Sequence, residues 1–136
     1  MENNNLEIIR KIVEEGFGKE DLSVIDHYVS DAVVEHQSGL GDGKEGLKNA
    51  INGLHTSFPD LNYDLQNHAE NGDTVWVHYK ASATHTGPFM GVPSSGKRFT
   101  IDVIDVARFE NNRLVEHWGI PDRFSLLMQL GLLDKK

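Results

Sequence analysis

The chain has 136 residues, no cysteine, and 21 acidic against 13 basic side chains, which give a formal net charge of −8. This acidic balance argues against a nucleic-acid or anionic-membrane partner, because phosphate binding needs a basic surface. The lack of cysteine excludes disulfides, a thiol nucleophile and a thiolate zinc site. Hydrophobic residues make up 38% and charged residues 25% of the chain. Length and composition together predict one ordinary globular domain over residues 1–136.

The start of the chain predicts a cytoplasmic protein. The first five residues lack the basic and apolar segments of a signal peptide. No apolar run approaches the roughly 20 residues that a membrane helix needs. We therefore expect neither secretion nor insertion into a membrane.

The first half of the chain is predicted to be mainly helical. Apolar residues recur at three- and four-residue spacing over residues 5–17, which is typical of an amphipathic helix. A second short helix is expected over residues 21–29, a short strand over 32–36 and a glycine-rich loop over 38–43. A third helix follows over residues 44–57, and Pro59 ends it.

The second half is predicted to be rich in strands. Polar and apolar residues alternate over residues 61–69, 75–85, 97–109 and 113–120, and a closing helix is expected over 123–133. Helices first and antiparallel strands second are typical of an α+β domain. We expect a cone-shaped barrel, in which a curved antiparallel sheet is wrapped by the N-terminal helices around an apolar interior.

The end of the last strand has two possible interpretations. Asp122 follows this strand closely and could lie at the edge of an apolar pocket beside Trp118. Its pKa would rise there, and it could move protons at neutral pH. Alternatively, Asp122 caps the closing helix, because aspartate is a favoured N-cap.

Strand alternation bears on which neighbours share the pocket. If Asp122 points inward, Glu116 and Trp118 are expected to do so as well, and His117 faces the convex side. Pro121 or a bulge could break this alternation. We therefore favour Trp118 over His117 as a pocket residue.

Two of the seven histidines stand at strand ends before glycine-rich loops, where sites are commonly built. His36 and His85 are therefore candidates to line the pocket and to polarise a substrate carbonyl. The chain has no His-Glu-x-x-His or other recognised ligand spacing, no P-loop and no dinucleotide fingerprint. We expect no metal, nucleotide or flavin cofactor.

Apolar and acidic residues complete the predicted pocket. Phe89 and Met90 lie in a loop that resembles a lid over a hydrophobic cavity. Asp102 and Asp105 have opposite parity, so only one of them can face inward without a bulge, and either could instead pair with Arg98 or Arg108. A similar pairing with Arg108 is the structural alternative for Glu116. The substrate-binding candidates are Trp118, Phe58, Tyr79, Phe89, Met90 and Asp105.

Several segments together resemble the SnoaL-like polyketide cyclase (ester cyclase) family, over about residues 6–132. The resemblance is carried by Phe58-Pro59-Asp60-Leu61, by Thr84-His85-Thr86-Gly87-Pro88-Phe89 with Gly91, Pro93, Gly96 and Lys97, by Ile104-Asp105 with Arg108-Phe109, and by Glu116-His117-Trp118 with Asp122 and Gln129-Leu130-Gly131. The resemblance implies a nuclear-transport-factor-like α+β barrel. It also implies a cofactor-free intramolecular aldol cyclisation, with Asp122 at the position of the family's acid/base aspartate. Pro121 departs from the bulky residue that relatives often carry there.

Three functions compete at this point. The first is a cofactor-independent acid/base enzyme acting on a small apolar carbonyl compound: a cyclase, or a ketosteroid-isomerase-like isomerase. Its catalytic candidates are Asp122, His36 and His85. The second is a non-catalytic module that binds a lipophilic small molecule. The third is an interaction domain that only dimerises. A homodimer is expected in any case, because Trp76, His78 and Lys80 give the outer sheet face an amphipathic surface.

Overall fold

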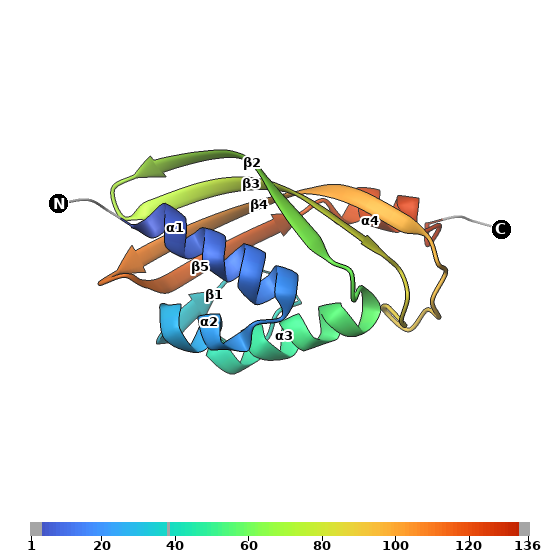
Figure 1. Cartoon of the computed structure of the whole chain (residues 1–136), viewed down its shortest axis with the longest axis horizontal. Coiled ribbons are helices and arrows are strands. Elements are labelled where there is room, and N and C mark those ends of the chain that lie inside the picture. The colour runs from blue at the N-terminus through green and yellow to red at the C-terminus, as the bar shows by residue number, and fades with distance from the viewer. Residues whose placement is uncertain (1–3, 38, 134–136) are drawn as a thin grey trace.

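Five strands form one curved sheet, and the helices pack on one side of it (Figure 1). The computed structural model describes residues 4–37 and 39–133. The elements, in chain order, are α1 Asn5–Lys11, the π-helix η1 Ile12–Phe17, α2 Leu22–Tyr28, β1 Val29–Glu35, α3 Gly43–Ser57, β2 Asn62–Asn71, β3 Thr74–Thr84, β4 Arg98–Glu110, β5 Arg113–Pro121 and α4 Arg123–Gln129. No helix in these ranges is long and apolar enough to span a membrane.

The sheet has the strand order β1-β5-β4-β3-β2. Strands β2 to β5 form the predicted antiparallel meander. Strand β1 departs from this prediction, because it pairs with β5 in parallel at the edge of the sheet. A parallel pair needs a long crossover, and α3 and the other three strands supply it. The sheet is therefore mixed, and it curves without closing into a barrel.

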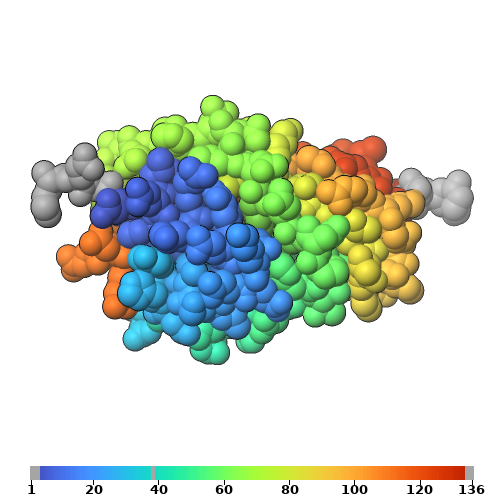
Figure 2. Space-filling model, in the orientation of Figure 1, coloured from blue at the N-terminus to red at the C-terminus, as the bar shows by residue number. Residues whose placement is uncertain are grey.

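The helices cover the inner face of the sheet at both ends. Helices α1, α2 and α3 lie together, whereas α4 packs against β4 at the other end (Figure 1). The space-filling view shows the N-terminal segment, in blue, covering much of this side (Figure 2). Asp21 caps α2 by accepting a hydrogen bond of 3.1 Å from the Ser23 amide, as expected for an N-cap aspartate.

Two apolar clusters fill the space between helices and sheet. The larger one joins α1, η1, α2 and α3 to the sheet, and Ile9, Ile25 and Ile51 are almost fully buried within it. The smaller one lies under α4, where the Phe58 ring packs 5.1 Å from the Phe99 ring. Residues of both clusters line the cavity described below, which therefore lies where the clusters meet.

A bulge in β5 decides which of its residues face inward. Arg108 pairs with Glu116, but the next residue of β4, Phe109, pairs with Leu114. Val115 is therefore an extra residue without a partner in the β4 register. An extra residue of this kind shifts the alternation of the strand that carries it. Leu114 and His117 are consequently both buried, although they have opposite parity in the sequence.

Candidate active site

A cavity of about 140 Å³ opens between the helices and the inner face of the sheet. Its volume is well above the roughly 10–15 Å³ that one water needs, so a small organic molecule can enter. Most of its wall is apolar: Ile9, Ile12, Val13, Phe17, Leu40, Leu54, Phe58, Leu61, Ala81, Phe89, Phe99, Ile101, Val103, Pro121 and Leu126. The polar or charged side chains of the wall are Gln37, Tyr63, Asp105, His117 and Arg123.

Asp105 is the carboxylate of this wall. It lies on the inward side of β4, in a row whose other members, Phe99, Ile101, Val103, Ala107 and Phe109, are all apolar and buried. Asp105 itself is only 6% exposed. A charged group in such surroundings is costly unless it is paired, so its partner is central to the site.

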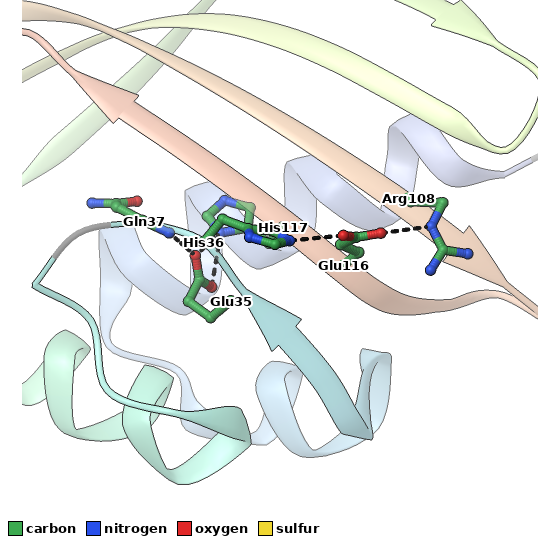
Figure 3. Close-up of polar contacts among 6 residues, drawn as sticks. All are labelled: Glu35, His36, Gln37, Arg108, Glu116 and His117. Atoms are coloured by element: carbon green, nitrogen blue, oxygen red, sulfur yellow. Dashed lines mark hydrogen bonds and ion pairs between the residues drawn. The ribbon is translucent and has the colours of Figure 1, made fainter.

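His117 is that partner. Its Nε2 lies 2.8 Å from Asp105 Oδ1. Its Nδ1 lies 2.7 Å from Glu35 Oε2 (Figure 3). The ring therefore bridges two carboxylates. Glu35 stands at the end of β1, directly opposite His117 in the parallel pair. We call these three residues, Glu35, His117 and Asp105, the inner triad. Three different strands contribute one member each.

The triad favours a protonated imidazole. Burial by itself lowers the pKa of His117, but the hydrogen bonds to Asp105 and Glu35 outweigh burial and raise the pKa to about 10. Both ring nitrogens then donate hydrogen bonds, one to each carboxylate. This leaves His117 no N–H for a ligand, whereas Asp105 keeps a second oxygen that makes no hydrogen bond within the described chain. Asp105 is therefore the member that can accept a proton from a bound molecule.

Tyr63 adds a neutral hydroxyl to the same cavity. Burial, and secondarily the charge of Asp105, raise the pKa of this phenol. Its ring packs edge-on against the Tyr79 ring at 5.9 Å. The hydroxyl stays protonated at neutral pH and can donate a hydrogen bond to a substrate oxygen.

Three of the predicted site residues line the cavity: Phe58, Phe89 and Asp105. Two others are buried but do not line it. His85 lies behind Phe58 and Phe89, at ring distances of 5.9 and 6.3 Å. Its Nδ1 accepts from the Ser95 amide. Tyr79 instead donates its hydroxyl hydrogen bond to Glu14, over 2.8 Å.

The remaining predicted residues lie outside the cavity wall. Met90 is 69% exposed, at the tip of a tight turn between Phe89 and Val92. His36 stacks on Trp118, with ring centroids 4.7 Å apart, on the outer side of the sheet. The structure thus reverses the expected orientation of Trp118 and His117. Strand β5 alternates regularly from Glu116 to Pro121, and His117 pairs with Ala107 of the inward row of β4, so His117 faces inward and Trp118 outward.

Asp122 is exposed and begins the last helix. Its carboxylate accepts a hydrogen bond of 3.0 Å from the Ser125 amide, which is the geometry of an N-cap. Of the two interpretations of this residue, the structure favours the helix cap. The expected acid/base role of Asp122 stays a prediction, and its position does not support it.

Sequence reasoning missed Glu35 and His117 as site residues. Alternation along residues 99–109 already singles out Asp105, which stands in an otherwise apolar row. No comparable signal marks Glu35, because β1 is short and its pairing with β5 is irregular. Over the described residues, no group of three His, Asp, Glu or Cys side chains is arranged to hold a metal ion.

Comparison with known proteins gives one consistent result. A family model described as SnoaL-like polyketide cyclase matches residues 7–130. Aklanonic acid methyl ester cyclase DauD of Streptomyces sp. (strain C5) is 26% identical, over 93% of this chain and 81% of its own length. The cyclase DnrD of Streptomyces peucetius, named for the same substrate, is 27% identical, over 93% and 90%.

Solved structures agree with this assignment. TsrD from Streptomyces laurentii superposes with a TM-score of 0.87 at 25% identity, over 98% of this chain and 99% of TsrD. IdmH from Streptomyces antibioticus, described as a putative polyketide cyclase, superposes with a TM-score of 0.84 at 29% identity, over 95% and 99%.

Proposed function

Because the chain belongs to the SnoaL-like polyketide cyclase family, we propose that it is a cofactor-independent acid/base enzyme for a small apolar carbonyl compound. The reaction we propose is an intramolecular aldol cyclisation. One observation carries this proposal: Asp105 presents a carboxylate to an apolar cavity while the buried His117 holds it in place.

The chemistry needs only a base, a dry cavity and correct orientation. Asp105 removes a proton from the carbon next to one carbonyl, and the electron pair of that C–H bond forms an enolate. The enolate carbon attacks a second carbonyl carbon of the same molecule, and the resulting alkoxide takes the proton back from Asp105. The net result is one new C–C bond, with a proton moved from carbon to oxygen.

The surroundings of Asp105 favour each stage. The His117 imidazolium fixes one carboxylate oxygen, so the other is directed at the substrate. The apolar wall offers few hydrogen-bond partners to waters that could protonate the enolate prematurely. The Tyr63 hydroxyl can donate to the second carbonyl oxygen as it becomes an alkoxide.

The relatives suggest where to look for the substrate. DauD and DnrD are named as cyclases of aklanonic acid methyl ester, so polyketide esters with two carbonyl groups are the first candidates. A ketosteroid-isomerase-like reaction would share the proton abstraction and omit the ring closure. The largely apolar wall would also suit a non-catalytic module that binds lipophilic molecules.

Proton exchange separates these functions. An apolar aryl methyl ketone is incubated with the protein in D₂O, and NMR follows the loss of protons next to the carbonyl. In a parallel experiment, aklanonic acid methyl ester is tested for ring closure. An enzyme accelerates the exchange, and Asp105→Asn abolishes the acceleration. Binding of the ketone without accelerated exchange would instead establish the binding module. Exchange without ring closure of any diketone ester would favour the isomerase.

We also propose a homodimer formed through the outer face of the sheet. Trp76, Val106 and Trp118 stand in register across β3, β4 and β5 on this face, and Trp76 is 39% exposed. Such a row suits a contact between identical copies. Light scattering is expected to report a dimer at micromolar concentration, and Trp76→Glu is expected to shift it toward the monomer. A monomer at that concentration in the unmodified protein would contradict the proposal.

A further inference from the structure

Gln37 stands beside the inner triad in a fixed backbone position. It follows β1 by two residues, and its side chain lines the cavity. Its backbone N–H donates a hydrogen bond of 2.9 Å to Glu35 Oε2, the oxygen that also binds His117 (Figure 3). Its carbonyl accepts from the Leu40 amide. The triad that holds Asp105 thus also anchors the backbone of Gln37.

Gly119 makes room for the side chain of Gln37. It pairs with Asp105 across β4 and β5. A β-carbon at position 119 would overlap Gln37 Oε1 and would lie 3.1 Å from Asp105 Oδ1. Gly119 is not among the glycines with positive φ, so backbone conformation gives no reason for a glycine here. The space that a side chain would fill at position 119 is taken by the Gln37 amide, next to the carboxylate.

From this arrangement we infer that Gln37 is a substrate-positioning residue. Gly119 leaves the space that the Gln37 side-chain amide occupies. The inference rests on the proposed function. The Gln37 amide oxygen faces Gly119, and the side chain extends away from Glu35 (Figure 3). The amide N–H groups therefore form the free end of the side chain. They bind the oxygen of the carbonyl whose neighbouring carbon loses its proton to Asp105.

A neutral hydrogen-bond donor suits the place beside Asp105. An enolate oxygen develops negative charge close to the Asp105 carboxylate, so it needs a hydrogen-bond donor there. His117 cannot serve, because both of its ring nitrogens are bonded to carboxylates. A neutral amide donates a hydrogen bond without giving up its proton, so Asp105 remains the group that takes the proton from the substrate.

A substitution at Gly119 tests the role of the Gln37 side chain without replacing Gln37 itself. Gly119→Ala is expected to displace the Gln37 side chain, because the clash falls on the end of a flexible group. Gly119→Ala and Gln37→Leu should each slow proton exchange of the aryl ketone by about 10²–10³-fold, as for the loss of one oxyanion donor. The double variant should be no slower than either single one. Gly53→Ala is the control, because a β-carbon there meets nothing within 4 Å.

Binding gives a second readout that does not depend on catalysis. In ¹⁵N-labelled protein, the Gln37 side-chain amide signal should shift when the ketone binds, also in Asp105→Asn. The Gln129 amide, which is bonded to Thr100 and Ser125 outside the cavity, should not shift.

If Gln37→Leu and Gly119→Ala keep full exchange while Asp105→Asn loses it, the inference fails and the proposed function stands. Ketone binding without any shift at Gln37 would also overturn it. If Asp105→Asn keeps both the accelerated exchange and the binding of the ketone, the proposed function is overturned instead.

Discussion

Two sets of polar residues lie on opposite faces of the sheet, where the end of β1 meets β5 and β4. The inner triad joins Glu35, His117 and Asp105. An outer set joins His36, Glu116 and Arg108, and Figure 3 shows this set beside Glu35 and His117 of the triad. Each set contains one histidine, and the shortest histidine–carboxylate contact is 2.7 Å in both. The side chains of the triad are 1–9% exposed, but those of the outer set are 22–39% exposed.

The comparison shows that burial, not contact length, distinguishes the inner triad from the outer set. In the outer set, hydrogen bonds from His36 and Arg108 lower the pKa of Glu116, and solvent screens the charges. In the triad, the charges interact in a medium of lower dielectric constant, so each depends on its partners. The predictions below separate the two sets.

The largest expected effect is on turnover. Asp105→Asn keeps the shape of the side chain and removes the base, so we expect kcat to fall by about 10²–10⁴-fold, the usual scale of general acid/base catalysis. Glu116→Gln is the matched change in the outer set and should leave kcat within about twofold of the value for the unmodified protein. Steady-state kinetics with a cyclised substrate measures both. Equal turnover rates for Asp105→Asn and the unmodified protein would rule out Asp105 as the base.

The next effect is on stability. His117→Leu leaves two buried carboxylates without their cation, and we expect it to lower the free energy of unfolding by about 3–5 kcal/mol. His36→Leu removes only a partly exposed pair, for which about 0–1 kcal/mol is typical. Urea unfolding of both variants measures the difference. Similar losses in the two variants would show that burial does not distinguish the sets.

The raised pKa of His117 predicts how stability depends on pH. The pKa is raised from 6.5 to about 10 in the folded protein, so the folded state binds this proton more tightly than the unfolded state does. The contribution of His117 is therefore fully present below about pH 6.5, falls as pH rises, and is lost by pH values above about 10. Unfolding measured from pH 6 to 10.5 should show a steeper decline for the unmodified protein than for His117→Leu. Parallel curves would contradict a protonated His117.

The smallest effect concerns Asp122, which lies outside both sets. Asp122→Ala should lower the free energy of unfolding by about 0.5–2 kcal/mol through loss of the helix cap, and Asp122→Asn should change it by much less, because asparagine caps as well as aspartate. Neither change should alter kcat. If Asp122→Asn instead lowers kcat 10²-fold or more with unchanged stability, the acid/base role moves back to Asp122.

Much of the fold follows from local patterns. The helix over residues 5–17, the helix ended by Pro59 and the four long strands are all present near their predicted bounds. Helical and strand periodicity depend on neighbouring residues, so the sequence carries them directly. The sequence also predicts that only one of Asp102 and Asp105 faces inward. The structure identifies Asp105, whereas Asp102 is paired with His78 and Lys80 on the outer face.

The site itself depends on contacts between distant residues. By itself, the sequence determines an α+β domain with an apolar interior and a carboxylate in an apolar row of a long strand. Only the tertiary structure decides that His117 rather than Trp118 faces that carboxylate, because the register of β5 against β4 places His117 opposite the buried Ala107 and Trp118 opposite the half-buried Val106. Only the parallel pairing of β1 with β5 brings Glu35 to His117, across 82 residues of chain. Strand alternation is a local property, but bulges and register are set by the packing of whole strands.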